Sequence, residues 1–273
     1  MPVALKILLP VVGAVLFCLF CWLFLIAPRR KKLAELAVPY AHRGLWDATL
    51  PENSLPAFQK AVEHGFGIEL DVQLSADGEV MVFHDSTLSR VCRREGRLAD
   101  FSAGELSAFS LSGSEETIPT LREVLALVKG RVPLLIELKG ESGNTALCPA
   151  VAALLRDYHG AYSVESFNPL LLRWFKKHEK NTVRGLLVTD LQKAKRPGSR
   201  GVNFLLSHCL LNFLCRPAFY AYDKAYPHSI ARRVGRLLGA GMFVYTVHDP
   251  AEYRWFLSNG ICPIFDGFLP NGK

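Results

Sequence analysis

Acidic residues are missing from the first 34 positions, which hold five basic ones, Lys6, Arg29, Arg30, Lys31 and Lys32. Removing these five from the 32 basic residues of the chain leaves 27, against 25 acidic residues. The formal charge of +7 therefore belongs mainly to the N-terminus, and residues 35–273 carry a balance of only +2. A nearly neutral domain lacks the excess of positive charge that is typical of nucleic-acid-binding proteins. We expect no nucleic-acid partner.

Outside one Cys-x-x-Cys pair in the apolar N-terminal stretch, cysteine pairs with the spacing of a zinc site are also lacking. Cys18 and Cys21 lie in an apolar stretch, and the other five are scattered: Cys92, Cys148, Cys209, Cys215 and Cys262. An odd number without regular spacing argues against a disulfide framework. We interpret these residues as small buried hydrophobic side chains in a reducing compartment.

Charge is almost absent between Val3 and Pro28, where Lys6 is the one charged residue. A helix of about 20 apolar residues spans a bilayer, so Ile7–Ala27 is long enough. A cleaved signal peptide is the alternative. Its apolar run is usually shorter, its positive cluster precedes the run, and a small-x-small cleavage site follows. We predict an uncleaved single-pass membrane anchor over residues 1–34. The basic cluster after the span places domain 35–273 in the cytoplasm.

No glycine-rich nucleotide loop follows the first apolar β-like run. From residue 37 onward such runs alternate with amphipathic stretches, which is typical of a parallel sheet. The predicted strands are Val38–His42, Gly67–Leu74, Pro133–Lys139, Tyr162–Phe167, Arg184–Thr189, Ala218–Asp223, Met242–Val247 and Cys262–Phe268. The predicted helices are Ser54–His64, Leu121–Lys129, Thr145–Tyr158, Pro169–Glu179, Ile230–Leu238 and Ala251–Ser258, with Asn53 or Ser54 as the first N-cap. Eight strands favour an α/β fold, a TIM-type (β/α)8 barrel, for which about 240 residues suffice.

Two segments depart from this alternation. Asp77-Gly78 lies between Leu70–Leu74 and Val80–Phe83, which predicts a hairpin. Residues 85–117 then show weak periodicity, so we expect a small insertion after the second strand. The apolar run Asn203–Cys215 is interpreted as a core helix, with a second membrane contact as the alternative.

Carboxylates occupy positions in the predicted strands where apolar residues are expected. Glu69 and Asp71 are two residues apart and share a face, as do Glu137 and Lys139. Adjacent buried carboxylates repel each other unless a cation lies between them. A hard divalent ion, Mg²⁺ or Ca²⁺, with oxygen ligands is therefore expected, and Lys139 can neutralise an anion beside it.

Two histidines lie near the same strand ends. His42-Arg43-Gly44 ends the first strand, and His84-Asp85 follows the hairpin. If the turn centres on residues 76–77, position 69 lies across from position 84, which brings His84 to the carboxylates. Catalytic residues of barrel enzymes lie at the C-terminal ends of the strands.

Five short motifs in order carry a family resemblance: Ala41-His42-Arg43-Gly44, Pro51-Glu52-Asn53-Ser54, Glu69-Leu70-Asp71-Val72, Phe83-His84-Asp85 and Glu137-Leu138-Lys139. This set resembles the glycerophosphodiester phosphodiesterases. The resemblance implies a TIM-type barrel that binds one divalent cation through Glu69, Asp71 and Glu137. It further implies that His42 and His84 form the acid–base pair, that Arg43 and Lys139 bind phosphate, and that Glu52 and Asn53 support the site.

Later matches to the family are weaker. Phe167 lies in a serine–phenylalanine strand end, and Tyr245 stands where the family commonly has Trp. His248 replaces Asn, and Phe265-Asp266-Gly267-Phe268-Leu269-Pro270 replaces a Thr-Asp-x-Pro motif. Because these residues are expected to line the upper pocket, the departures bear on substrate specificity.

The resemblance implies metal-dependent hydrolysis of glycerophosphodiesters to glycerol phosphate and an alcohol, in lipid metabolism. Two alternatives stay open. The first is a lysophospholipase D-type reaction on membrane lysophospholipids, and the second is a catalytically silent barrel that binds a ligand.

Overall fold

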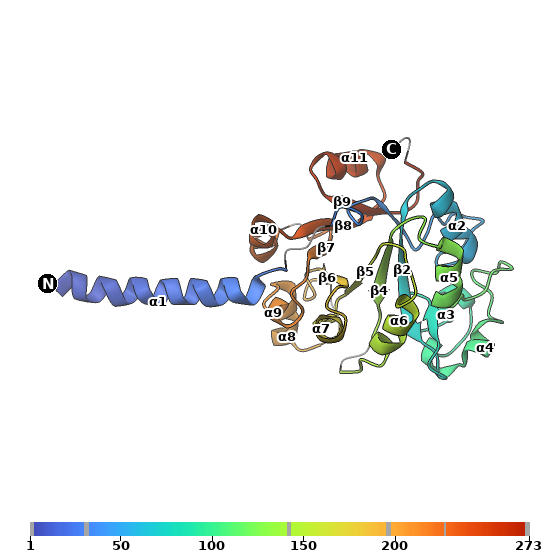
Figure 1. Cartoon of the computed structure of the whole chain (residues 1–273), viewed down its shortest axis with the longest axis horizontal. Coiled ribbons are helices and arrows are strands. Elements are labelled where there is room, and N and C mark those ends of the chain that lie inside the picture. Colours follow the sequence, from blue (N-terminus) through green and yellow to red (C-terminus); the bar gives the residue numbers. More distant parts are fainter. Residues whose placement is uncertain (1–2, 30–32, 141–142, 195–197, 227, 271–273) are drawn as a thin grey trace.

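A computed structural model of the chain describes residues 3–29, 33–140, 143–194, 198–226 and 228–270. Its N-terminal helix α1 (Val3–Ile26) projects from a compact barrel (Figure 1). Residues Lys6–Ile26 are long and apolar enough to cross a membrane, with a mean hydropathy of 2.7, and a signal sequence meets the same test. Of the basic residues predicted to follow the span, Arg30, Lys31 and Lys32 lie outside the described residues.

Eight parallel strands form the barrel. They are β1 (Tyr40–His42), β2 (Gly67–Leu74), β4 (Leu134–Leu138), β5 (Tyr162–Ser166), β6 (Val183–Val188), β7 (Phe219–Asp223), β8 (Gly241–Val247) and β9 (Cys262–Phe265). Each pairs with the next in this order, and β9 pairs with β1 to close the ring. The prediction of a TIM-type barrel is confirmed, and the observed strand ends differ from the predicted ones by three residues or fewer.

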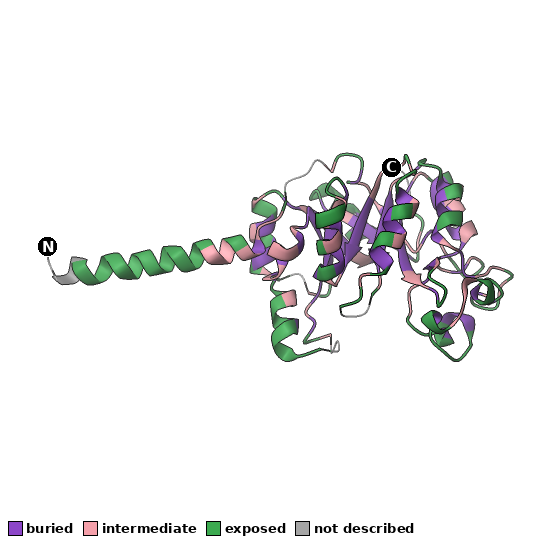
Figure 2. Cartoon of the chain, turned by 60° about the horizontal axis from the view of Figure 1, so that its bottom comes forward, coloured by how far each residue is buried: buried purple, intermediate pink, exposed green. Residues whose placement is uncertain are grey.

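Helices surround the barrel and bury one face each (Figure 2). They are α2 (Leu55–Glu63), α5 (Leu121–Val128), α6 (Leu147–Leu155), α7 (Pro169–His178), α8 (Arg200–Ser207), α9 (Asn212–Cys215), α10 (Ile230–Leu237) and α11 (Pro250–Ser258). Ser54 is the N-cap of α2, since its Oγ accepts a hydrogen bond from the Ala57 amide. Inside the barrel the large rings of Tyr40, Phe219 and Phe243 pack together. A Cβ at Gly185 would lie 2.0 Å from the Phe219 ring, so this inward position must be glycine.

The predicted hairpin is present, but its predicted register is wrong by one residue. Strand β3 (Val80–Val82) pairs antiparallel with β2, with Leu74 opposite Val80. The turn centres on Asp77, because the Ser75 amide donates to the Glu79 carbonyl at 3.0 Å and Ser75 Oγ donates to Asp77. Residue 83, not 82, therefore lies opposite Asp71, and 69 does not face 84.

The segment after β3 is a small insertion, as predicted. It contains α3 (Ser89–Cys92), a 3₁₀ turn (Leu98–Asp100) and α4 (Ala103–Leu106). Ten buried side chains form its own core: Met81, Phe83, Leu88, Val91, Cys92, Leu98, Leu106, Phe109, Leu111 and Ile118. This separate core keeps the insertion rigid beside the mouth of the barrel.

The interpretation of Asn203–Cys215 as a core helix is wrong for its first half. The run forms two helices, and α9 buries Asn212 and Cys215. Helix α8 instead buries Asn203 and leaves Val202, Phe204 and Leu205 exposed. Val202, Phe204 and Leu205 therefore face away from the barrel, whereas Asn203 and the half-buried Leu206 occupy the inner side of α8.

The C-terminal end of α1 is built into the barrel wall. Ile26 is fully buried, and its carbonyl accepts hydrogen bonds from Asn212 Nδ2 and Tyr220 Oη, both at 3.1 Å. Arg216 Nη1 donates to the carbonyls of Phe24 and Ala27 at 2.6 and 3.0 Å. A guanidinium at this position stabilises the last carbonyls of a helix. The division of the chain at residue 34 stays a prediction, and contacts cross it.

Candidate functional site

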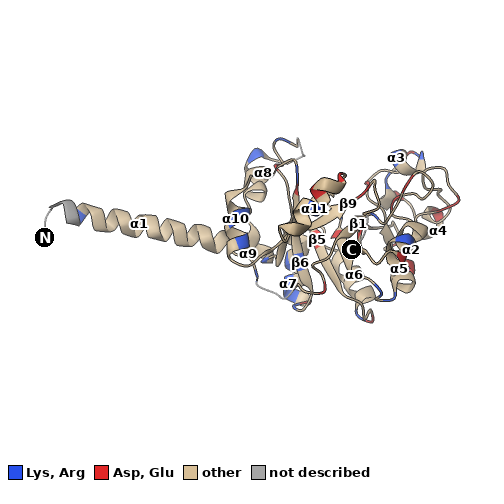
Figure 3. Cartoon of the chain, turned by 90° about the horizontal axis from the view of Figure 1, so that it is seen from above, with Lys and Arg blue, Asp and Glu red and all other residues tan. Residues whose placement is uncertain are grey.

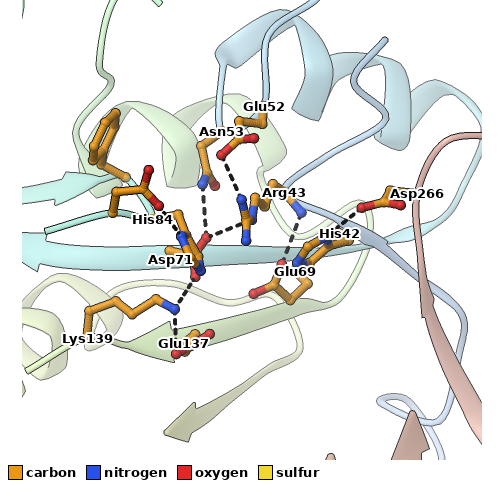
Figure 4. Close-up of polar contacts among 12 residues, drawn as sticks. His42, Arg43, Glu52, Asn53, Glu69, Asp71, His84, Glu137, Lys139 and Asp266 are labelled. Carbon is orange, nitrogen blue, oxygen red and sulfur yellow. Dashed lines mark hydrogen bonds and ion pairs between the residues drawn. The ribbon is translucent and has the colours of Figure 1, made fainter. Parts of the chain in front are cut away.

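The strand register places acidic residues side by side at the C-terminal end of the barrel. Asp71 on β2 is paired with Glu137 on β4, and Glu137 is paired with Glu165 on β5. His42 on β1 is paired with Glu69. Because neighbours in register share a face of a sheet, these side chains converge on one side of the barrel (Figure 4).

A tight turn after β1 directs Arg43 into this cluster. Arg43 and Gly44 both have positive φ, 58° and 85°. A Cβ at position 44 would lie 2.9 Å from the carbonyl carbon of Ala57, so only glycine fits. The turn aims the Arg43 amide at Glu69 Oε2 at 3.0 Å, and its side chain lies 3.5 Å from Asp71. Backbone and side chain of one residue thus contact two carboxylates.

Glu69, Asp71 and Glu137 are buried, and each offers an oxygen within 4.8 Å of the others. Two further groups hold Asp71: Lys139 Nζ at 3.1 Å and Asn53 Nδ2 at 3.0 Å. Lys139 Nζ also lies 2.7 Å from Glu137. The three predicted metal ligands and both predicted phosphate contacts, Arg43 and Lys139, are therefore together in the structure.

The carboxyl groups of this cluster differ in the direction of their pKa shifts. Burial, together with the nearby Asp71, raises the pKa of Glu69 well above its usual value. Burial also raises the pKa of Glu137 to about 7. For Asp71, burial acts in the same direction, but Lys139, His84 and Arg43 outweigh it and lower the pKa. The cluster thus holds more carboxylates than its fixed cations can neutralise.

Glu165 is a fourth buried carboxylate that sequence reasoning missed. Burial and the neighbouring Glu137 raise its pKa well above the usual value. The sequence contained a signal for it. Glu165 is a charged residue in an otherwise apolar strand, as Glu69 and Glu137 are in their strands. Its side chain lines the same cavity as Glu69 and Glu137.

The residues present fit a hard divalent cation. The donors are carboxylate oxygens, which such ions prefer. Three buried polar atoms around them, Arg43 Nε, Asn53 Oδ1 and Glu165 Oε2, have no hydrogen-bond partner among the described residues. A cation would relieve the repulsion among the acids and allow Glu69 and Glu137 to ionise.

Both predicted histidines are held at Nδ1 by an aspartate. His42 Nδ1 donates to Asp266 Oδ2 at 2.7 Å, and His84 Nδ1 donates to Asp85 Oδ1 at 2.6 Å. This leaves Nε2 of each ring to exchange a proton. Burial lowers the pKa of His84. Asp266 also accepts a hydrogen bond from His248, so it serves two histidines.

A network behind the cavity links the predicted supporting residue Glu52 to the insertion. Arg90 on α3 donates to both oxygens of Glu52, at 2.9 and 2.7 Å, and to Asp85 at 2.5 Å. Glu52 also accepts from Arg43 at 2.8 Å. Sequence reasoning missed Arg90 and the role of Asp85, because no local pattern indicates that the insertion reaches back to the site. Gln73 reinforces this arrangement by donating to the carbonyls of residues 83, 84 and 85.

The cluster opens into a cavity of about 690 Å³. His42, His84 and Lys139 line it on one side. Phe167 and Tyr245, the other predicted supporting residues, line it too, with ring centroids 6.3 Å apart in an edge-to-face arrangement. A phosphate group and a larger substituent can therefore lie between charged and aromatic walls.

The sequence profile described as the glycerophosphoryl diester phosphodiesterase family matches residues 42–268. The chain belongs to this family. A glycerophosphodiester phosphodiesterase of Caldanaerobacter subterraneus is 38% identical over 160 residues, which cover 54% of this chain and 65% of that protein. One from Bacillus altitudinis is 42% identical over 107 residues, covering 37% and 43%. The chain thus spans about half the length of the curated relatives it matches.

Solved structures of glycerophosphodiester phosphodiesterases resemble the whole barrel. The enzyme of Thermotoga maritima superposes with a TM-score of 0.63 at 30% identity, covering 84% of this chain and 94% of that one. A phosphodiesterase of Oleispira antarctica, in complex with its product sn-glycerol-3-phosphate, gives a TM-score of 0.69 at 24% identity, covering 84% and 92%. The second likeness concerns the fold alone.

Proposed function

We propose that this protein hydrolyses glycerophosphodiesters to glycerol phosphate and an alcohol. The observation that carries the proposal is the pairing of a three-carboxylate cluster with two aspartate-held histidines around one cavity. Family membership supports the same reaction. The glycerol-3-phosphate bound to the Oleispira antarctica phosphodiesterase suggests the product.

In this proposal Glu69, Asp71 and Glu137 hold one divalent cation, Mg²⁺ or Ca²⁺. When bound, the cation supplies positive charge that polarises the phosphoryl group. Lys139 and Arg43 neutralise the equatorial phosphoryl oxygens, on which negative charge lies during in-line attack. Asn53 and Glu52 keep Asp71 and Arg43 in place through their hydrogen bonds.

The two histidines carry the protons. We assign the base to His42, whose Nε2 takes the proton of the attacking hydroxyl, and the acid to His84, whose Nε2 protonates the leaving alcohol. The nucleophile is water or the neighbouring glycerol hydroxyl, which would give a cyclic phosphate that water then opens. Asp266 and Asp85 hold the rings in the tautomer that leaves Nε2 free.

A pair of substrates tests the reaction and the two roles together. Glycerophosphocholine has a poor leaving group, choline, which needs a proton as it departs. A p-nitrophenyl diester of glycerol phosphate releases p-nitrophenolate, which departs without a proton. On glycerophosphocholine, His42→Ala and His84→Ala should each lose about 100- to 10,000-fold in rate. On the nitrophenyl substrate, His84→Ala should recover most of its activity and His42→Ala should not. The opposite pattern would exchange the roles, and a wild-type rate for both variants on glycerophosphocholine would refute the site.

A lysophospholipid is the second candidate substrate, and apolar side chains next to the main cavity support it. A small cavity beside the main one is lined by Leu186, Leu191 and Leu206, and it shares Phe167 and Leu187 with the main cavity. It lies toward a groove that includes Trp22 of α1, since both are lined by Thr189. Release of choline from lysophosphatidylcholine faster than from glycerophosphocholine would favour this substrate.

We further propose that α1 is an uncleaved membrane anchor with the barrel in the cytoplasm. The burial of Ile26 and the hydrogen bonds to its carbonyl support retention, because cleavage would remove part of the barrel wall. Arg29 and the basic residues after it support the orientation. Mass spectrometry of the protein from membranes tests retention, and a mass lacking residues 1–26 would contradict it.

A further inference from the structure

Charge is distributed very unevenly over the barrel domain. Residues 191–240 hold nine Lys and Arg and a single acid, Asp223. Removing these from the 27 basic and 25 acidic residues of 35–273 leaves 18 basic and 24 acidic, so the rest of the domain is net negative. The near-neutral total charge therefore conceals a positive segment and a net negative remainder. The positive segment contains α8, α9 and α10, which surround the C-terminal end of α1 (Figure 3).

Exposed apolar side chains gather on two of the same helices. Among the described residues of 33–270, nine large hydrophobic side chains are exposed: Leu170, Val202, Phe204, Leu205, Ile230, Leu237, Trp255, Leu257 and Leu269. Five of these lie on α8 and α10. Ile230 and Leu237 are 73% and 84% exposed and, with the exposed Arg233 between them, follow one stripe of α10. Exposed apolar side chains together with Lys and Arg are typical of helices that lie at a membrane surface.

The two helices meet α1 at a shared groove. A groove of about 540 Å³ is lined by Trp22 of α1, by Ser207 and His208 at the end of α8, and by Ile230 at the start of α10. The ring of Phe204 stacks on His208 with centroids 4.1 Å apart, which continues the apolar surface from α8 to the groove. Tryptophan at this place is typical of the boundary between bilayer and water.

Helix α1 cannot swing freely relative to these helices. Asn212, the first residue of α9, and Arg216, which follows its last, bond the last carbonyls of α1, and Arg216 also stacks on Phe24 at 4.5 Å. If α1 crosses a bilayer, the faces of α8 and α10 around its base lie next to the headgroups. The docking of α1 therefore fixes which surface of the barrel meets the lipid.

We propose that α8 and α10 form a second membrane-contact surface, which lies against the anionic leaflet from which α1 emerges. The inference rests on the proposed anchoring by α1. Val202, Phe204, Leu205 and Ile230 enter the interface, and Arg200 and Arg233 lie among the lipid phosphates. Basic side chains near an anionic surface are attracted to its phosphates. Arg232 takes no part, because it is buried over the ring of Tyr222.

Hydrogen–deuterium exchange of the full chain in nanodiscs tests this surface. One nanodisc contains phosphatidylcholine alone, and the other contains phosphatidylcholine with roughly 30–40% phosphatidylglycerol. We expect amides of 200–207 and 230–237 to exchange about fivefold more slowly in the anionic disc. Helices α3 and α4, in the insertion on the far side of the barrel, should exchange equally in both. The double variant Arg200→Glu, Arg233→Glu should lose the difference, while the control Arg122→Glu, Arg156→Glu on α5 and after α6 should keep it.

The peptide 7–26 separates the two proposals. Its protection in both discs supports anchoring by α1, and exposure of this peptide would refute the anchor itself. Protection of 7–26 with equal exchange of 200–207 and 230–237 in both discs would overturn the second contact alone. Slower exchange of α8 and α10 in detergent at rising protein concentration would assign the surface to a second copy of the chain and would also overturn it.

Discussion

Binding of a divalent cation should stabilise the protein strongly at neutral pH and only weakly at pH 5. The reason lies in the carboxyl cluster, where burial raises the pKa of Glu137 to about 7. A cation must displace the proton that Glu137 holds below this pH, so affinity falls up to about tenfold for each pH unit below 7. The raised pKa of Glu69 acts in the same direction.

The magnitude follows from mass action. An ion at 100 times its dissociation constant stabilises the folded state by about 2.7 kcal/mol. At pH 5, the same ion concentration is about equal to the dissociation constant, and the stabilisation of the folded state is about 0.4 kcal/mol. For a chain of this size, about 1 kcal/mol shifts the melting temperature by about 2–4 °C. We therefore expect increases of about 5–10 °C at pH 7.5 and about 1 °C at pH 5.

The protein without an ion should show the opposite trend. A carboxyl group with a raised pKa binds its proton more tightly in the folded state than in the unfolded chain. Its stabilising effect is therefore present below about pH 4.5 and is lost as the pH rises toward 7, where Glu137 ionises in the folded protein. The ion reverses this loss, so plots of melting temperature against pH with and without the ion should separate as the pH rises.

Thermal unfolding of the full chain in detergent, followed by circular dichroism with EDTA or with excess Mg²⁺ or Ca²⁺, measures the effect. Glu137→Gln should remove most of the increase and its pH dependence, whereas Glu63→Gln on the exposed face of α2 should retain both. An equal increase at pH 5 and 7.5, or an unchanged increase in Glu137→Gln, would refute the reasoning.

Three further variants test single contacts. Arg90→Ala should lower kcat about 10- to 100-fold by releasing Asp85, with little change in melting temperature, as steady-state kinetics and circular dichroism can show. Asp266→Asn should lower kcat by up to about 10,000-fold, because His42 would adopt the wrong tautomer, and retention of the wild-type pH–rate profile would contradict this. Arg216→Ala should destabilise the full chain by about 0.5–1.5 kcal/mol in denaturant titrations, because the carbonyls of Phe24 and Ala27 lose their donor; an unchanged midpoint would show that these bonds contribute nothing.

Much of the site follows from local sequence pattern. Charged residues two apart in otherwise apolar strands are visible without a structure, and parallel strands bring them to one end of a barrel. For this reason Glu69, Asp71, Glu137 and Lys139 are together as expected. Glu165 is also a charged residue in an apolar strand, but it was missed because it has no charged neighbour two positions away.

Contacts between distant segments could not be read in this way. Arg90 reaches Glu52 across 38 positions, and Asp266 reaches His42 across 224. The hairpin shows how small an error matters, since hydrogen bonds of Ser75 centre the turn on Asp77 and move every pairing by one residue. His84 still reaches Asp71, because Gln73 and Asp85 hold it after β3 has ended.

Total charge and apolar runs also mislead when they are averaged along the chain. A balance of +2 conceals the basic segment 191–240 within an otherwise net negative domain, and the arrangement of helices places this segment around α1. The apolar residues of 203–215 do not all face inward, because Asn203 takes the buried side of α8.

The docking of α1 against the barrel wall has a consequence for proteolytic release. Ile26 fills a fully buried position, and Asn212, Arg216 and Tyr220 all bond to the backbone at this point. A protease that cut the chain after residue 29 would leave these donors facing an empty site in the outer wall. A barrel released in this way would therefore be less stable than the anchored one. The fold would be most stable while the barrel stays attached to its membrane helix.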